Sequence, residues 1–182
     1  MNFKGNYHYL IIFSLFLIIF FFIGSYLDFN RHWTTNYDHE FTLVYNALLF
    51  NNGKSIEYVA HPGYFTILFL SLFIKLLSIL SFISVDKLSL LTSENFDQSF
   101  QILMFYTRVY SSFCVALFCF ITYVLFFQFS KNKFYSIILS LIIFSSLSTI
   151  FHSAQLRTEL LAMFFLSLSL ICFKLFLENI QK

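Results

Sequence analysis

The stretch "VYSSFCVALFCFITYVLFFQF", Val109 to Phe129, contains no charged residue. A transmembrane helix needs about 20 consecutive, mainly apolar residues, and this run is long enough. It is followed at once by the short polar segment "SKNK", 130–133, and then by a second apolar run, Phe134 to Phe151. Together these segments predict two membrane-spanning helices joined by a tight connection.

Two more apolar runs lie outside this pair, Leu10 to Leu27 and Leu160 to Leu177. The whole chain of 182 residues is 59% hydrophobic and only 11% charged, and its mean hydropathy is +0.78. These values lie far outside the range of soluble domains. We therefore predict an all-α integral membrane protein, a single membrane domain over 1–182, with spans at 10–27, 109–129, 134–151 and 160–177.

The segment Thr66 to Val85 is long enough to cross a membrane, but it contains Lys75 near its middle. A lysine at the bilayer centre costs about 2.5–3.5 kcal/mol on insertion scales. A helix over 64–85 that lies along the interface avoids this cost. A crossing helix is the alternative, and it would invert everything that follows it.

Lysines favour the interfacial arrangement, because cytoplasmic loops are enriched in Lys and Arg. With four spans, the N-terminus is inside and five lysines fall on the inner side: Lys4, Lys131, Lys133, Lys174 and Lys182. The loop 28–101 and the turn 151–160 then lie outside. The predicted location is an integral membrane protein, in the inner membrane if the source is bacterial.

The charge content argues against a nucleic-acid-binding protein, and the cysteine positions argue against a cysteine metal site. The net charge is +2, and the Lys and Arg residues are too scattered to form a phosphate-binding surface, so nucleic acid is not an expected partner. Cys114, Cys119 and Cys172 lie inside apolar runs and lack metal-site spacing.

The outer loop contains the segment "NYDHEFTLVYNALLFNNG", 36–53. Apolar residues recur from Phe41 at helical spacing, which predicts an amphipathic interfacial helix over 38–51. Asp38 and Glu40 suit the start of that helix, as an N-cap and a first-turn acid. The helix should end at "NNG", where Gly53 can adopt left-handed geometry.

Other polar residues gather on the same predicted face. "HPGY", starting at His61, precedes the next helix, and Arg108 begins the span 109–129. Arg157 and Glu159 lie in "LRTEL", in the second outer segment. Each has an ordinary explanation: a turn before a helix, an arginine that snorkels to head groups, and a local ion pair. Their occurrence together on one face suggests a functional site.

In these residues the sequence resembles the GT-C membrane glycosyltransferases, in particular the protein O-mannosyltransferases and the lipid A aminoarabinose transferases. The matching order is an anchor helix, the acidic "YDHE", an amphipathic helix ending in "NNG", and "HPGY" in place of a His-Pro-Pro-Leu motif. It continues with an arginine heading a span in "TRVYSSFCVAL" and an acid in "LRTEL". The pattern covers nearly the whole chain, although no single motif in it is highly specific.

The resemblance implies transfer of a sugar from a polyprenyl-phosphate donor to an acceptor at the outer membrane face, with inversion. It implies that Asp38 or Glu40 is catalytic. Donor and phosphate binding would involve the following residues: His39, His61, Arg108, Arg157 and Glu159. No cofactor is certain, but two outer carboxylates could hold one divalent cation.

Members of this family have about seven or more spans, so the four predicted spans look like an N-terminal half, apparently incomplete at the C-terminus. We expect that this chain alone is inactive and that a second chain could supply further spans. The alternative is a non-catalytic membrane-structural, assembly or transport subunit. Sugar, acceptor, metal dependence and oligomeric state are not predicted.

Overall fold

The computed structural model describes residues 7–27, 29–35, 40–57 and 63–180. This part of the chain is helical and contains no strand, which confirms the predicted all-α class. Its elements, in chain order, are α1 (Tyr7–Tyr26), α2 (Glu40–Asn51), α3 (Tyr64–Ile79), the short 3-10 helix η2 (Leu88–Leu90), α4 (Phe96–Ser130), α5 (Lys133–Phe144), α6 (Leu147–His152) and α7 (Thr158–Ile180).

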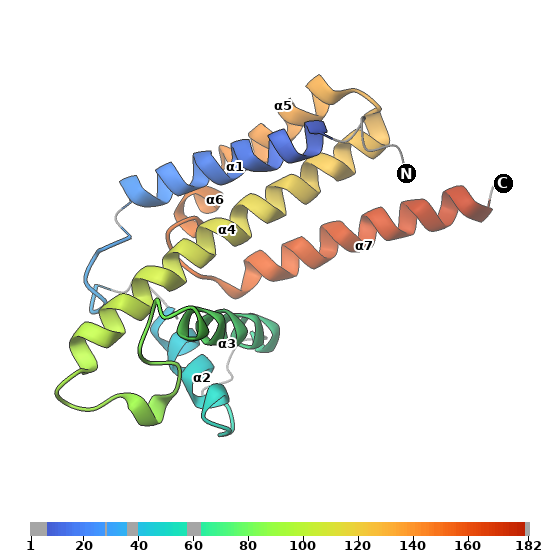
Figure 1. The fold of residues 1–182 in the computed structure, drawn as a ribbon. Coiled ribbons are helices and arrows are strands. Elements are labelled where there is room, and N and C mark those ends of the chain that lie inside the picture. Colours follow the sequence, from blue (N-terminus) through green and yellow to red (C-terminus); the bar gives the residue numbers. More distant parts are fainter. Residues whose placement is uncertain (1–6, 28, 36–39, 58–62, 181–182) are drawn as a thin grey trace.

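Among the described residues, α1, α4 and α7 are long and apolar enough to cross a membrane. They correspond to the predicted spans 10–27, 109–129 and 160–177. Helix α4 is central, since α1, α5 and α7 all pack against it (Figure 1). Much of the surface of α1 and α7 is exposed and apolar, as expected for helices that face lipid.

Helix α1 packs on its neighbours through one stripe of residues. Ile12, Phe16, Phe20 and Gly24 are buried, and they recur every fourth position, on one side of the helix. A Cβ atom at Gly24 would lie 2.7 Å from Ser112 Oγ on α4 and 2.2 Å from the Phe29 ring. Gly24 therefore allows the end of α1 to approach α4 closely.

The connection between α4 and α5 is as tight as predicted. Lys131 ends α4 in the left-handed conformation, with φ of 55°, and the Asn132 side chain caps α5 by accepting hydrogen bonds from the backbone N–H groups of Phe134 and Tyr135. Lys174 of α7 lies at this end too, because its ammonium group donates to the Gln128 carbonyl. The start of α1 and the end of α7 lie at the same end (Figure 1).

The predicted span 134–151 differs from the structure, which divides it into α5 and α6. The division falls at Ser145 and Ser146, where Ser146 is extended and its side chain accepts from the Thr149 N–H to cap α6. Serine side chains compete with helical hydrogen bonds in this way. With 12 residues, α5 is only about 18 Å long, so it does not span a bilayer core as one straight helix.

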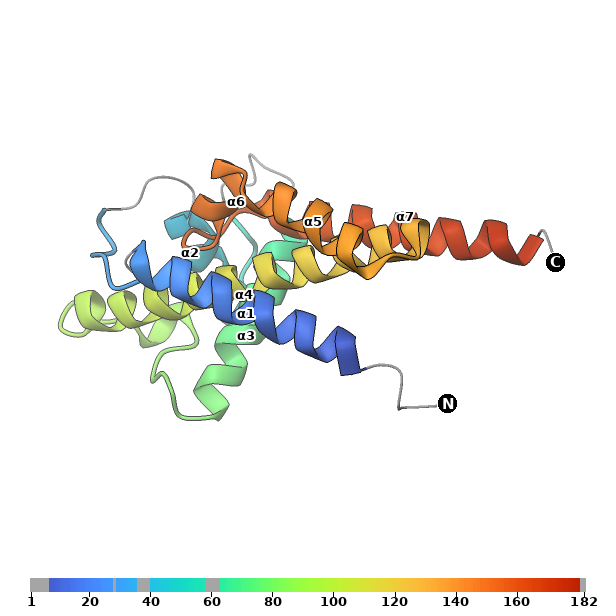
Figure 2. The ribbon, with the colours of Figure 1, turned by 90° about the horizontal axis from the view of Figure 1, so that it is seen from above.

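Helices α2 and α3 pack together at the opposite end of the bundle (Figure 1). Gly53 follows α2 with φ of +73°, which confirms its predicted left-handed geometry. Helix α3 runs across the direction of α4 and α7 (Figure 2), and Lys75 on it is exposed. It ends at Ile79 rather than 85, because Ser81 turns the chain with φ of 63°. The interfacial placement of α3 stays a prediction.

Helix α4 begins well before its predicted span, at Phe96 instead of 109. The additional turns bury Phe100, Leu103, Met104, Thr107 and Arg108, which follow a helical spacing. Phe100, Leu103 and Met104 pack with α2, α3 and Leu156 in an apolar core at this end of the molecule. A second core lies between α1, the spanning part of α4, Phe144 and the start of α7.

Candidate functional site

Glu40, the first residue of α2, has a carboxylate that is fully buried. Its Oε2 accepts a hydrogen bond of 3.3 Å from Arg108 Nε and lies 3.6 Å from Arg31 Nη2. Its Oε1 accepts from the backbone N–H of Leu156 at 3.4 Å. One carboxylate thus joins three segments that are far apart in the sequence. We call Arg31, Glu40, Arg108 and the backbone of 154–156 the Glu40 cluster.

Arg108 is fully buried on α4. Besides its contact with Glu40, its Nη1 donates to the carbonyl of Phe29 at 3.0 Å and to the carbonyl of Arg31. These contacts hold the segment that follows α1 against α4. Arg108 therefore stabilises the site from inside the protein and does not present its guanidinium to a ligand in this structure.

Arg31 connects this first segment to the turn between α6 and α7. Its Nη2 donates to the Ala154 carbonyl at 3.1 Å, and its side chain is 15% exposed. Sequence reasoning did not select this residue, although "FNRHW", 29–33, lies in the loop that was predicted to be outside. The missing information was the distance to Glu40, which depends on tertiary folding.

The electrostatics of Glu40 are governed by burial and by two cations. Loss of hydration raises the pKa of the Glu40 carboxyl above its ordinary value, whereas Arg108, Arg31 and the Leu156 N–H act in the opposite direction. Burial has the larger influence on the pKa. A buried ion pair stabilises the fold only where its distances and additional hydrogen bonds offset the loss of hydration of both partners.

Further contacts fasten the first segment to the beginning of α4. The Trp33 backbone N–H donates to Gln101 Oε1 at 2.9 Å, and its indole N–H donates to Asp97 Oδ1 at 2.6 Å. Gln101 Nε2 in turn donates to the Asn30 carbonyl at 2.9 Å. The segment 29–33 is thus held in place before the chain reaches α2.

The segment between α6 and α7 is fastened to α4 by two neighbouring serines of α4. Ser111 Oγ donates to the His152 carbonyl at 2.6 Å, and Ser112 Oγ donates to the Ser153 carbonyl. Gly63 at the start of α3 also meets this region, since a Cβ atom on it would lie 3.7 Å from Thr158 Cβ. Gly63, in "HPGY", and Thr158, in "LRTEL", are therefore close together in space.

The predicted site residues fall into three groups. Asp38, His39 and His61 lie outside the described residues. Glu40 and Arg108 are in contact. Arg157 is partly exposed and Glu159 exposed just beyond the cluster, where Glu159 Oε2 accepts from Thr158 Oγ1 at 3.2 Å. Within the described ranges, no three His, Cys, Asp or Glu residues could hold a metal ion.

Gln155 is another residue that sequence reasoning missed. It is only 8% exposed, and its Nε2 is buried without a hydrogen-bond partner in the described part of the chain. Its neighbours Ala154 and Leu156 are bound through their backbones to Arg31 and Glu40. A buried donor without a partner costs about 1–3 kcal/mol.

We expect Gln155→Met to stabilise the protein by about 1–2 kcal/mol, because the thioether side chain has a similar length and no unsatisfied donor. Thermal unfolding of the purified protein in mild detergent measures this. Gln98→Met is the control, since Gln98 is exposed on α4 and should change stability by less than about 0.5 kcal/mol. A lower stability of Gln155→Met would mean that the amide has a partner in the membrane-embedded protein.

The site as a whole is a buried charged cluster that joins two connecting segments at one end of a helix bundle, with Arg157 and Glu159 at its edge. Such an arrangement can position a carboxylate and a guanidinium near the membrane surface, where an anionic head group would lie. Comparison with known proteins adds no assignment: no family model, no curated protein and no solved structure matches this chain.

Proposed function

We propose that this chain is part of a glycosyltransferase that moves a sugar from a polyprenyl-phosphate donor to an acceptor at the outer membrane face. The observation that carries the proposal is the Glu40 cluster, which joins the segment after α1 to the segment before α7. Two of the motifs on which the resemblance to GT-C transferases depends, "YDHE" and "LRTEL", adjoin these two segments. Helices α2 and α3 also follow α1 in the order that the resemblance implies.

In the proposed reaction, the acceptor hydroxyl oxygen attacks the anomeric carbon as the bond from that carbon to the phosphate oxygen breaks. Asp38 accepts the hydroxyl proton, and polyprenyl phosphate leaves with the bonding electron pair. Attack from the face opposite the leaving group inverts the anomeric centre. The base contributes only if its carboxylate lies within hydrogen-bond reach of the acceptor.

Arg157 is our choice for the donor phosphate, because it is partly exposed at the start of α7 whereas Arg108 is buried against Glu40. A guanidinium can bind two phosphate oxygens at once. Glu40 and Arg108 act as positioning residues in this scheme. A divalent cation, with Glu159 as one ligand, is an option within the same proposal.

Photolabelling tests this function. Membranes containing the protein are irradiated with a polyprenyl-phosphate hexose that carries a diazirine on the sugar. We expect labelled peptides from 29–40 and 151–160, with labelling that excess unlabelled polyprenyl phosphate suppresses. Arg157→Met should weaken the labelling, and Lys133→Met, at the opposite end of the bundle, should not.

Absence of suppressible labelling in both segments would contradict the proposal. It would favour the second candidate, a non-catalytic membrane-structural, assembly or transport subunit. The observation that favours this candidate is the large exposed apolar surface of α7, which includes Met163, Leu166 and Phe173. In a membrane such a surface contacts either lipid or further helices.

The proposed sidedness is tested with reporter fusions. We expect a fusion after Lys133 to report the cytoplasm, because Lys131, Lys133 and Lys174 lie at one end of the bundle. A fusion after His152 should report the outside. The opposite pair of results would place the Glu40 cluster on the cytoplasmic side and exclude an outer-face transferase.

A further inference from the structure

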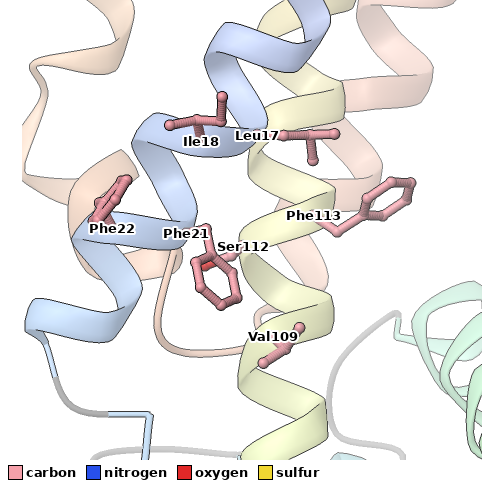
Figure 3. Close-up of a pocket in the computed structure, with 7 residues that line it drawn as sticks. All are labelled: Leu17, Ile18, Phe21, Phe22, Val109, Ser112 and Phe113. Carbon is pink, nitrogen blue, oxygen red and sulfur yellow. The ribbon is translucent and has the colours of Figure 1, made fainter.

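Two parts of the surface differ in the chemistry that they offer to a ligand. The groove between α1 and α4 is lined by apolar side chains and Ser112 (Figure 3). Both helices are candidate membrane spans, so an apolar surface there is expected. A second surface, near the start of α4, instead combines exposed aromatic rings with carboxylates.

Three aromatic rings form a row on this second surface. Trp33 precedes α2, whereas Phe41 and Tyr45 lie one turn apart on it. The ring centroids of Trp33 and Phe41 are 6.1 Å apart, and those of Phe41 and Tyr45 are 6.4 Å apart, so the row is about 12 Å long. Phe41 is 36% exposed, and the other two rings are partly exposed. We call Trp33, Phe41 and Tyr45 the aromatic row.

A carboxylate lies at each end of the aromatic row. Asp97 Oδ1 accepts from the Trp33 indole N–H at 2.6 Å, and Glu57 Oε2 accepts from Tyr45 Oη at 3.0 Å. The Asp97 side chain is 74% exposed, and Glu57 is exposed too. Within the described ranges, neither carboxylate forms an ion pair with a lysine or an arginine. His32 Nε2 lies 3.6 Å from Asp97 Oδ1 and is charged only when protonated.

The polar groups of this surface accept hydrogen bonds, because its donors are already used. The Trp33 indole and the Tyr45 hydroxyl donate to the two carboxylates, and Gln101 Nε2 donates to backbone carbonyls. Carboxylates only accept hydrogen bonds, and the faces of aromatic rings attract cations. A neutral hydroxylated ligand finds no unused donor among these side chains, whereas an ammonium ion finds acceptors and ring faces.

The position of Asp97 on α4 favours a ligand that is dissolved in water. Asp97 lies twelve residues before Val109, which is about 18 Å along a helix. The head-group layer on each side of a bilayer is only about 5–8 Å thick. For the predicted span 109–129, Asp97 therefore lies beyond the lipid head groups.

We propose that the aromatic row binds an extended aliphatic amine that has an ammonium group at each end. One ammonium group lies against Asp97 and the other against Glu57, and the methylene chain between them packs on the rings. Two linked ammonium groups bind better than one, because the second contact forms within the complex. This inference does not depend on the proposed transferase function.

Trp33 makes the proposal measurable, because it is the only tryptophan of the chain. Spermidine is added to the full chain in nanodiscs of phosphatidylcholine, and the tryptophan emission is recorded. We expect a saturable change. Butylamine, with one ammonium group, should need an about tenfold higher concentration for half-saturation. Magnesium chloride at equal ionic strength should leave the emission unchanged.

Two variants remove one negative charge each and keep the hydrogen bonds of the row. Asp97→Asn retains an acceptor for the Trp33 indole, and Glu57→Gln retains one for the Tyr45 hydroxyl. Each should raise the spermidine concentration at half-saturation about three- to fivefold, the effect of losing one exposed ion pair. Glu94→Gln is the control, because Glu94 is exposed just before α4, and it should change that concentration less than about twofold.

Three results would overturn the inference. The first is the absence of a saturable change with spermidine. The second is half-saturation by butylamine at the same concentration, which would mean that a single carboxylate acts alone. The third is an unchanged response in both Asp97→Asn and Glu57→Gln, which would place the binding elsewhere. The transferase proposal is tested separately and stands unchanged after any of these results.

Discussion

Glu40→Gln is expected to lower the free energy of unfolding by about 3–5 kcal/mol, the usual result of removing one partner from a buried ion pair. The glutamine is similar in size, so the loss comes from charge and not from packing. Arg108 is fully buried and Arg31 nearly so, and both guanidiniums face the Glu40 carboxylate. For a chain of this length, the thermal midpoint should fall on the order of 10 °C.

Glu57→Gln is the matched control, because Glu57 follows α2, the helix that begins at Glu40, but is exposed and accepts a hydrogen bond from Tyr45 Oη at 3.0 Å. It should change stability by less than about 0.5 kcal/mol. The double variant Glu40→Gln with Arg108→Met should recover part of the loss, because one of the buried cations has also been removed. A Glu40→Gln variant as stable as Glu57→Gln would contradict the structural role of the cluster.

Asp38→Asn is expected to reduce sugar transfer by about 10²- to 10⁴-fold, the effect typical of losing a general base. Stability should change little, because asparagine caps a helix about as well as aspartate. The assay measures transfer from the polyprenyl-phosphate donor in membranes that contain the protein together with a partner chain supplying further spans. Activity is expressed per amount of folded protein.

Glu40→Gln provides the contrast for this prediction as well. Its expected defect is loss of folded protein, whereas that of Asp38→Asn is loss of turnover in a folded protein. Full transfer by Asp38→Asn would exclude Asp38 as the base. If folded Glu40→Gln protein alone lost transfer, the catalytic role would move to Glu40, and normal activity of both would reduce "YDHE" to the start of an interfacial helix.

Local patterns in the sequence predicted the helical class, the long spans and two helix ends. Gly53 and the "SKNK" connection are recognisable because their geometry depends on few neighbouring residues. The break between α5 and α6 was missed, since apolar residues continue on both sides of Ser145 and Ser146. The early start of α4 was missed because its polar residues, such as Asp97 and Gln101, resemble a loop.

The site was harder to predict than the fold, because its defining contacts are long-range. Glu40 and Arg108 were selected separately from composition and position, but 68 residues separate them in the chain. Nothing in either local sequence indicates that one would neutralise the other. Arg31 and Gln155 carry no motif at all, and only the folded arrangement of the two loops makes them notable.

Gly63 before α3 and Thr158 at the start of α7 lie side by side, and an engineered disulfide between these two positions measures that contact. Gly63→Cys and Thr158→Cys would place two Cβ atoms about 3.7 Å apart, close to the mean of about 3.8 Å in natural disulfides. Gly63 has a φ of −98°, which a cysteine can adopt. Cys172, the exposed native cysteine, is first replaced by serine.

Mild oxidation in membranes, followed by mass spectrometry, should yield a peptide that links positions 63 and 158 in most molecules. The control pair, Gly63→Cys with Lys131→Cys, should not crosslink, because Lys131 ends α4 at the far end of the bundle from α3 (Figure 1). We expect the 63–158 crosslink and not the 63–131 crosslink. A protein that unfolds cooperatively but forms no 63–158 crosslink would contradict that contact.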